Sequence, residues 1–230
     1  MNTSFCHLQI PLPEGMQHIT VVQYDVKTFQ PEDLMILPHR AALQRAVPLR
    51  CAEHLAGRLA ARQALLLLGV AAPFPAIGHH RQPLWPAGVI GSISHTRQRA
   101  LATVAKSSCD IAGLGIDLEP QLSSQQAHEI ADTVMQGEER EMASNSGLPF
   151  EQAVTLVFSA KESLFKALFT HVGDWFDFSA AVITDISLSD QRFTLRLAQA
   201  LTPALPAGMA FSGHWRDVHG DMMTLLRFAL

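Results

Sequence analysis

Two acidic residues lie two positions apart in the segment Gly115–Glu119, which has the sequence GIDLE. Because alternate residues of a strand share a face, Asp117 and Glu119 would point the same way, with Cα atoms about 7 Å apart. Magnesium prefers oxygen ligands and takes one or two carboxylates together with waters and substrate phosphate. The pair therefore suits a magnesium site, while a solvated acidic strand face is the other interpretation of this spacing.

A second group of reactive side chains lies in the segment FSAKESLFK, residues 158 to 166. Phe158, Glu162, Phe165 and Lys166 are spaced at i, i+4, i+7 and i+8, which places them on one stripe of a helix. An acid beside buried aromatic rings needs a partner, because an unpaired buried charge is unfavourable. Lys166 supplies such a partner, so an ordinary ion pair is the alternative to a functional acid and base.

A third group consists of cations at intervals of four, namely Arg50, His54, Arg58 and Arg62. In a helix each step of four residues advances by about 40°, so these side chains form one slanting stripe. Guanidinium groups bind phosphate through two parallel hydrogen bonds, which makes such a stripe suitable for a phosphate ligand. A solvated helix face is again the alternative.

Two further groups do not support a different chemistry. Ser92 and Ser94, in GSISH, lack the trailing glycine and the following helix of a hydrolase nucleophile elbow. His79 and His80 have no cysteine or acidic companions at zinc spacing. A glycine-rich phosphate loop is also missing from the sequence.

Helices and strands must position these groups, and the sequence indicates both. Helices are predicted from composition and breakers over residues 33–46, with a break at Pro38, and over 50–68, 125–135 and 149–169. Strands are predicted over residues 18–24, 89–94, 99–105, 111–118, 180–188, 192–197, 209–216 and 222–228. This mixture in both halves of the chain predicts an α+β fold.

The composition is that of a folded globular protein, with 48% apolar and 17% charged residues among 230. Charge is distributed unevenly. Residues 1–115 contain ten Lys and Arg against six Asp and Glu, whereas residues 116–230 contain seven against fifteen. The resulting charges of +4 and −8 suit a first half that receives an anion and a second half that holds a cation, although solvated surface charge gives the same numbers.

Membrane insertion and secretion are not expected. The longest apolar run, residues 64–75, is interrupted by Gly69 and Pro73 and is shorter than the roughly 20 residues that span a bilayer. The first sixteen residues lack the basic and apolar regions of a secretory signal. Three widely spaced cysteines, Cys6, Cys51 and Cys109, form neither a metal pair nor a disulfide framework. We therefore expect a cytoplasmic protein.

The motifs HLAGRLAAR, RQPLWP, SISH, GIDLE and FSAKESLFKA occur in this order and resemble 4′-phosphopantetheinyl transferases of the enterobactin synthase component D type. The resemblance extends from about Leu37 to the last strands. It implies a pseudo-twofold α+β fold of two similar halves, each with a small sheet packed on helices, and coenzyme A at their junction. Residues 1–115 would contact the nucleotide of coenzyme A. Residues 116–230 would hold the magnesium site and the helix that contains Lys161, Glu162 and Ser163, called the KES helix below.

The resemblance also implies a reaction and a set of site residues. The enzyme would move 4′-phosphopantetheine from coenzyme A to a carrier-protein serine and release adenosine 3′,5′-bisphosphate. Asp117, Glu119 and Glu162 would bind Mg²⁺, with Mn²⁺ as an alternative. Lys166 would face the pyrophosphate, and Glu162 would act as base for the serine, directly or through a metal-bound water.

The resemblance places further residues around coenzyme A, in addition to Asp117, Glu162 and Lys166. These are Arg50, Arg58, Arg81, Gln82, Pro83, Ser94, His95 and Phe176. Arg62 is a weaker candidate, and Trp175 would line the pantetheine channel with Phe176. Many relatives have lysine at the position of Gln82, which leaves Arg81 to supply the charge there.

The expected partners are coenzyme A and apo carrier domains of nonribosomal peptide or siderophore synthases such as those that make enterobactin. We expect no nucleic-acid partner and no transmembrane segment. The protein would be either a monomer or a member of a loose synthase complex, and such a complex would place it at the periphery of a membrane. Two other functions share these residues: a non-catalytic module that binds coenzyme A or a carrier protein, and a magnesium phosphohydrolase.

Overall fold

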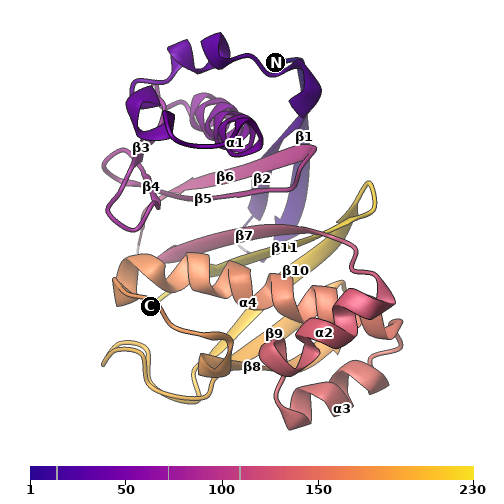
Figure 1. Cartoon of the computed structure of the whole chain (residues 1–230). Helices are drawn as coiled ribbons and strands as arrows, with labels where there is room; N and C mark the ends of the chain where they lie inside the picture. The colour runs from indigo at the N-terminus through magenta and orange to yellow at the C-terminus, as the bar shows by residue number, and fades with distance from the viewer. Residues whose placement is uncertain (14, 72, 109) are drawn as a thin grey trace. The chain divides into compact units, whose positions relative to one another are not determined.

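A computed structural model describes residues 1–13, 15–71, 73–108 and 110–230, and Cys109 lies outside this range. The chain forms two compact units, Met1–Ser108 and Cys109–Leu230 (Figure 1). The boundary lies before strand β7 (Gly113–Pro120), which pairs along its whole length with a strand of the second unit. A boundary after residue 115, as expected from the sequence, would divide this strand. In the described part of the chain, none of the helices has the length and apolarity needed to cross a membrane.

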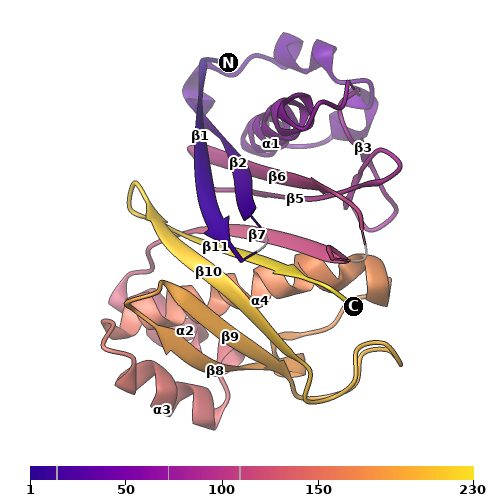
Figure 2. The same cartoon turned by 180° about the vertical axis from the view of Figure 1, so that it is seen from behind.

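The first unit contains an antiparallel sheet with the strand order β1-β2-β6-β5 (Figure 2). Its strands are β1 (Thr3–Leu12), β2 (Gly15–Tyr24), β5 (Val89–His95) and β6 (Arg99–Lys106), and β3 (Ala76–Ile77) pairs separately with β4 (Pro83–Leu84). Its helices are α1 (Pro48–Leu67) and the 3₁₀ helices η1 (Val26–Thr28), η2 (Pro31–Ile36) and η3 (Arg40–Leu43).

Helix α1 confirms the helix predicted over residues 50–68. Pro48 occupies its first turn, where a missing N–H costs nothing, and the chain leaves the helix at Gly69, whose φ is +78°. Alanines 52, 56, 60 and 64 recur every four residues and are buried, so the helix packs closely on the sheet residues Val22, Ala100 and Ala102.

The helix predicted over residues 33–46 is wrong. This segment forms only η2 and η3, because Pro38 has no N–H to donate and disfavours helical backbone in Leu37. Asp33 caps the segment by accepting a bond from the backbone N–H of Gln30, and it also binds the N-terminal ammonium at 2.6 Å. Strand β1 was not predicted, because most of its side chains are exposed and therefore show no buried alternation.

The second unit contains a sheet with the strand order β7-β11-β10-β9-β8. The strands that follow β7 are β8 (Ala181–Ser187), β9 (Arg192–Leu197), β10 (Ala210–Val218) and β11 (Asp221–Phe228). The helices are α2 (Ser124–Val134), α3 (Gly137–Asn145), α4 (Phe150–Val172) and the 3₁₀ helix η4 (Phe178–Ala180). All were predicted except α3 and η4. The sequence of α3, GEEREMASN, is mostly polar, and the helix buries only Glu139 and Ala143.

Helix α4 organises the core of the second unit. Its apolar residues, among them Leu156, Ala160 and Leu164, are buried with Phe193 and Leu195 of β9 in one cluster. The helix ends at Gly173, which adopts a left-handed conformation with φ +74°. Each unit thus packs a long helix with an antiparallel sheet, which confirms the α+β class (Figure 1). The pseudo-twofold relation between the halves stays a prediction.

Candidate active site

Two glycines allow α4 to lie against β7 at the predicted acidic site. A Cβ atom on Gly115 would lie 1.9 Å from the backbone oxygen of Ser163, and one on Gly113 would lie 2.6 Å from that of Ala167. Gly113, Gly115 and Asp117 occupy alternate positions of β7 and therefore share one face of the strand. The close approach brings residues 162 to 166 of α4 within reach of the acidic residues on that face.

The contact between Asp117 and Lys166 is the centre of this site. Lys166 Nζ donates to Asp117 Oδ1 at 2.6 Å, and the Asp117 side chain is only 2% exposed. Both residues were predicted as catalytic, and the structure brings them together from β7 and α4. The pair is charge-assisted and buried on the carboxylate side, which makes it stronger than a surface ion pair.

Glu119 and Glu162 add two more carboxyl groups to this pair. Burial and the charges of Asp117 and Glu162 raise the pKa of Glu119 to about 8. Burial and Asp117 also raise the pKa of Glu162, while Lys166 opposes the shift. Three acids and one lysine therefore share a partly buried site that has more negative than positive groups.

These residues suit a hard divalent cation in donor type and charge. All three side chains are oxygen donors, and a cation would offset the repulsion and desolvation that raise the two glutamate pKa values. Across the described residues, no three His, Cys, Asp or Glu side chains already stand in the arrangement of a metal cage. The assignment of Asp117, Glu119 and Glu162 as ligands stays a prediction.

The lysine next to Glu162 has a different role. Lys161 is 3% exposed and donates to Glu139 Oε2 at 2.8 Å, to the carbonyl of Val134 at 2.7 Å and to that of Phe178 at 3.0 Å. Glu139 in turn accepts from the backbone N–H of Ile183 at 2.7 Å. All three N–H groups of this ammonium thus donate hydrogen bonds to protein acceptors. Lys161 therefore joins α4 to neighbouring segments and has a structural role.

An aromatic pocket of about 170 Å³ adjoins Glu162. Its lining includes Phe165, Trp175, Phe176 and Phe178, so the predicted site residues Glu162 and Phe176 face the same space. Trp175 is 68% exposed and stacks on Phe165 with ring centres 4.9 Å apart. An exposed tryptophan supported from behind by another ring offers a rigid apolar surface to a ligand.

In the first unit, two of the predicted nucleotide-binding residues are in direct contact. Arg50 Nη1 lies 2.9 Å from His95 Nε2, joining α1 to β5, and it also lies 3.3 Å from Glu53 Oε2. Ser94, the neighbour of His95 on β5, is buried. Arg50 and His95 thus form one polar group on the surface of this unit.

Arg58 lies two turns further along α1 and is 5% exposed. It donates to the carbonyl of Ala76 at 3.3 Å, and its buried Nε has no hydrogen-bond partner among the described residues. Burial, together with the nearby charge of Arg50, lowers the pKa of Arg58 to about 10. An anion beside Arg58 would reverse this penalty, as expected of a phosphate-binding residue.

The other two cations of the predicted stripe are engaged differently. Arg62 lies over the ring of Phe74 at 4.9 Å, a cation–π contact. His54 Nε2 lies 2.9 Å from His39 Nε2, and burial with the charge of Arg58 lowers the pKa of His54 to about 3. Burial thus disfavours a charge on His54, and Arg62 faces an aromatic ring, while the role of the stripe in phosphate binding stays a prediction.

The three candidates from the RQP segment lie around a tight turn. Arg81 is exposed and has φ +66°, Gln82 Oε1 accepts from the N–H of His80 at 2.9 Å, and Pro83 begins β4. The amide of Gln82 packs where a Cβ on Gly78 would stand, at 2.4 Å. Gln82 therefore serves the turn itself, and the contacts of this turn with a nucleotide stay predictions.

Comparison with known proteins identifies the family. The model of the 4′-phosphopantetheinyl transferase N-terminal domain matches residues 38–105, and that of the 4′-phosphopantetheinyl transferase superfamily matches residues 113–216. The chain is 40% identical to enterobactin synthase component D of Salmonella typhi over 94% of this chain and 88% of that protein. The chain belongs to the 4′-phosphopantetheinyl transferase superfamily. Its resemblance to that family, recognised from the motifs, is confirmed.

Other phosphopantetheinyl transferases are similar over much of their length. Enterobactin synthase component D of Escherichia coli O157:H7 is 45% identical over 70% of this chain and 74% of that protein. The 4′-phosphopantetheinyl transferase Svp of Streptomyces mobaraensis is 34% identical over 85% of this chain and 79% of that protein. The chain is therefore a transferase of phosphopantetheine to carrier proteins, with coenzyme A as the substrate that its family uses.

Three residues that shape this transferase site were missed in the sequence. Gly113 and Gly115 continue the face of Asp117 and Glu119, and their period of two in GLGIDLE was the available signal. Lys161 gave no signal, because its partner Glu139 is 22 residues away in a helix that was not predicted.

Proposed function

We propose that this chain transfers 4′-phosphopantetheine from coenzyme A to a serine of apo carrier domains in a magnesium-dependent reaction. The observation that carries the proposal is the contact of Asp117 with Lys166, whose charges shift the pKa values of Glu119 and Glu162, in a chain of this superfamily. A module that only binds coenzyme A has no need of buried acids whose charges disfavour one another.

Asp117, Glu119 and Glu162 would hold the magnesium ion. When bound, the ion would neutralise charge on the pyrophosphate and on the departing phosphate. The three side chains would serve as oxygen donors, and Lys166, which now donates to Asp117, would interact with phosphate when the substrate binds. The raised pKa values of both glutamates support this assignment, because these residues are unfavourable as anions without a cation.

The proposed reaction is a displacement at the phosphorus that carries the pantetheine arm. The serine hydroxyl oxygen forms the new P–O bond, the bond to adenosine 3′,5′-bisphosphate breaks, and the serine proton passes to the Glu162 carboxylate. Burial raises the pKa of Glu162, and a cation that offsets this shift would keep the carboxylate ionised and able to accept the proton. Lys166 would interact with the pyrophosphate oxygens and so keep the phosphorus in line with the serine.

The two units would share the binding of coenzyme A. In the first unit, Arg50, Arg58 and His95 would bind the 3′-phosphate, with Arg81, Gln82, Pro83 and Ser94 around the nucleotide. In the second unit, Phe176 and Trp175 would line the channel of the pantetheine arm. The buried guanidinium of Arg58 and the aromatic pocket beside Glu162 support these two assignments.

Relatives named enterobactin synthase component D support carrier domains of siderophore or other nonribosomal peptide synthases as acceptors. An aryl or peptidyl carrier domain is the acceptor that we propose. A monomer or a loose complex with such a synthase, in the cytoplasm or peripheral at a membrane, stays a prediction.

The test is incubation of purified apo carrier domain with coenzyme A and the chain, followed by intact-protein mass spectrometry. Wild-type protein with Mg²⁺ should add one phosphopantetheine group, and EDTA should stop the addition. Asp117→Asn should abolish it, whereas Asp185→Asn, at an exposed position on β8, should leave it unchanged. Mg²⁺ should also raise the Tm of wild type but not of Asp117→Asn.

Several outcomes would contradict the proposal. Tight binding of coenzyme A without modification of peptidyl, aryl or acyl carriers would support a binding module instead. Hydrolysis of coenzyme A without a carrier would support a phosphohydrolase. Unchanged turnover in Asp117→Asn would exclude the proposed role of that carboxylate.

A further inference from the structure

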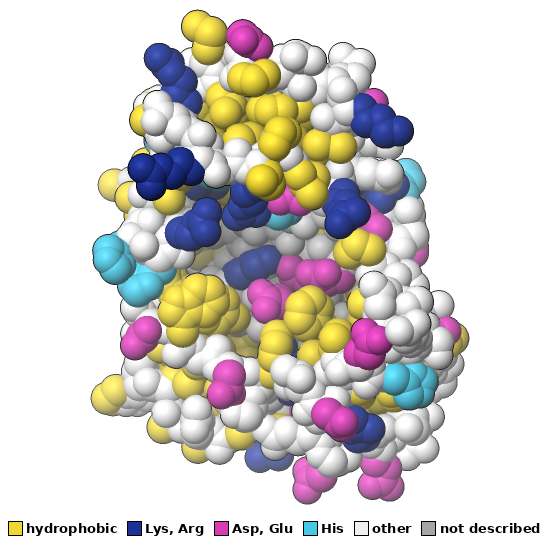
Figure 3. Space-filling view, in the orientation of Figure 1, with side chains coloured by type: hydrophobic (Ala, Val, Ile, Leu, Met, Phe, Trp, Pro, Cys, Tyr) yellow, Lys and Arg dark blue, Asp and Glu magenta, His cyan; other side chains and the backbone are white. Residues whose placement is uncertain are grey.

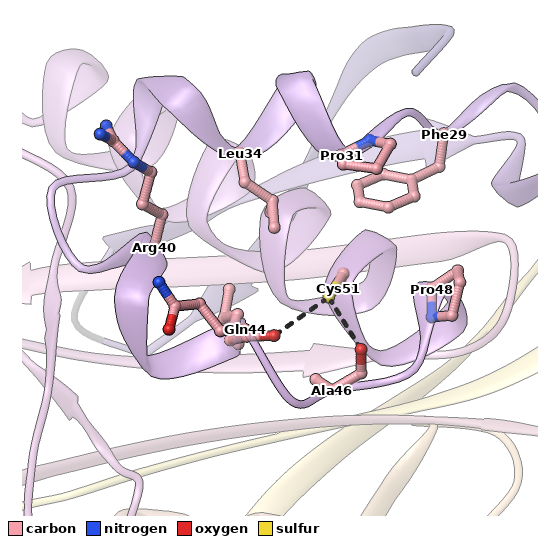
Figure 4. Close-up of a pocket in the computed structure, with 9 residues that line it drawn as sticks. Phe29, Pro31, Leu34, Arg40, Gln44, Ala46, Pro48 and Cys51 are labelled. Carbon is pink, nitrogen blue, oxygen red and sulfur yellow. Dashed lines mark hydrogen bonds between the residues drawn. The ribbon is translucent and has the colours of Figure 1, made fainter.

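An apolar groove lies in the first unit, apart from every residue assigned above. It has a volume of about 320 Å³ and runs between η2 and the segment that joins η3 to α1 (Figure 4). The residues that line it are Phe29, Pro31, Leu34, Arg40, Leu43, Gln44, Ala46, Pro48 and Cys51. The groove exists because Pro38 breaks this segment into short 3₁₀ turns that do not close over the core beneath them.

The groove has polar groups with unused hydrogen-bonding capacity at its rim. The Arg40 guanidinium and the Gln44 amide both line it, both are exposed, and neither side chain has a partner among the described residues. Among the residues that line the groove, none is acidic, so the charge of Arg40 is not neutralised within the lining. A complementary ligand therefore combines an apolar group with a carboxylate.

Large apolar side chains are also exposed on the segments that form the groove. Met35 is 66% exposed, Ile36 51% and Val47 65%. On the face shown in Figure 3, hydrophobic side chains gather on the first unit and Lys and Arg side chains lie at their borders. These three residues do not line the groove but belong to the segments around it, which adds exposed apolar surface of the kind that protein partners cover.

We propose that this groove docks the acceptor carrier domain, with an apolar side chain in the groove and a carboxylate against Arg40. The inference rests on the proposed function, which requires a protein substrate. Charge supports an acidic partner, since residues 1–108 contain ten Lys and Arg against five Asp and Glu. Pro48 and Cys51 line the groove and belong to α1, the helix that also contains Arg50 and Arg58.

The test measures the KM for apo carrier domain at saturating coenzyme A, and separately the KM for coenzyme A. Arg40→Glu should raise the carrier KM about tenfold, because it places like charges together, and should leave kcat and the coenzyme A KM unchanged. Arg45→Glu is the matched control, because Arg45 is exposed in the same segment and does not line the groove. It should change the carrier KM by less than about twofold at 0.15 M salt, where distant charges are screened.

A second variant tests the apolar part of the groove. Ala46→Phe should fill it and raise the carrier KM, and its Tm reports whether the protein is folded. Should this variant be unfolded, Arg40→Glu alone decides. An unchanged carrier KM in Arg40→Glu, or an equal rise in Arg45→Glu, overturns the docking proposal while leaving the transferase function intact. A wild-type dimer in light scattering that Arg40→Glu dissociates would assign the groove to a second copy and also overturn the proposal.

Discussion

The two units bury charged groups of opposite sign and leave them incompletely neutralised. In the second unit, Asp117, Glu119 and Glu162 share the positive charge of Lys166, and the pKa of Glu119 rises to about 8. In the first unit, Arg58 is buried against a carbonyl, and its pKa falls to about 10. Both shifts disfavour the charged form, and burial is the main cause of each.

This difference indicates what each unit needs from a ligand. The acidic group of the second unit is stabilised by cations, and the guanidinium of the first unit by an anion. Under the proposed function, magnesium coenzyme A would supply both, as a divalent cation with several phosphates. The buried pair of Lys161 and Glu139 shows the contrast, because there each charge has a partner and no ligand is needed.

The largest effect is expected from Glu162→Gln, which removes the proposed base and one metal ligand. We expect kcat to fall by about 1000-fold, since proton transfer and cation binding are both impaired. The Tm should not fall, because the change removes a buried charge. Glu129→Gln, at an exposed position of α2, is the control. A loss of less than tenfold in kcat would contradict the role of Glu162 and the comparison built on it.

The two lysines of α4 should differ in what they affect. Lys161→Met leaves the buried Glu139 without its cation and should lower the free energy of unfolding by about 3 kcal/mol. Lys166→Met should lower kcat with a smaller loss of stability, because the Lys166 side chain is 25% exposed whereas that of Lys161 is 2% exposed. Urea denaturation and the carrier mass assay separate the two effects. An equal loss of stability in Lys161→Met and Lys166→Met would contradict the view that the Lys161–Glu139 pair serves stability and Lys166 serves the reaction.

Gly115→Ala tests whether the contact of α4 with β7 positions the acidic site. The new methyl group would lie 1.9 Å from the Ser163 carbonyl oxygen, so the helix must move. We expect a loss of about 2 kcal/mol in stability and a reduced kcat. Gly137→Ala is the control, because no atom lies within 4 Å of its Cβ position. Normal transfer in Gly115→Ala would show that the site tolerates displacement of α4.

Arg58→Met tests the cationic unit. It should raise the KM for coenzyme A about tenfold, as expected for loss of one charged phosphate contact, without lowering the Tm. The KM for 3′-dephospho-coenzyme A should be the same in wild type and variant, which would identify the 3′-phosphate as the contact. An equal effect on both substrates would place Arg58 away from the 3′-phosphate. Arg45→Met serves as the control for loss of a positive charge.

The smallest effect is expected for His54, which burial and Arg58 keep neutral with a pKa of about 3. In the unfolded chain the imidazole has a pKa near 6.5, so the unfolded state binds more protons between these values. Stability should therefore fall as the pH drops below about 6.5, and His54→Gln should reduce this loss by about 3 °C in Tm between pH 7 and 5. The exposed His128→Gln should not change the slope. If Tm changed with pH in His54→Gln as it does in wild type, this result would contradict a neutral His54 imidazole in the folded state.

The fold could be predicted where periodicity and composition are strong. Helices α1 and α4 and most strands follow from alanine and leucine content, alternation and glycine ends. The prediction for residues 33–46 was wrong, because the composition of this segment favours an α-helix while Pro38 and the capping by Asp33 favour 3₁₀ turns. Strand β1 and helix α3 were missed, because exposed residues leave no hydrophobic pattern.

The sequence by itself determined the family and the identities of the acidic and basic candidates, because motif order and strand alternation are local properties. Only the tertiary structure decided which charges meet: Lys166 binds Asp117, Lys161 binds Glu139, and Arg62 lies over Phe74. These pairings depend on which segments are packed together and on which atoms lose water. The carboxylates of Asp117 and Glu119 on β7 and of Glu162 on α4 come together because Gly113 and Gly115 have no side chains, which allows α4 to lie close to β7.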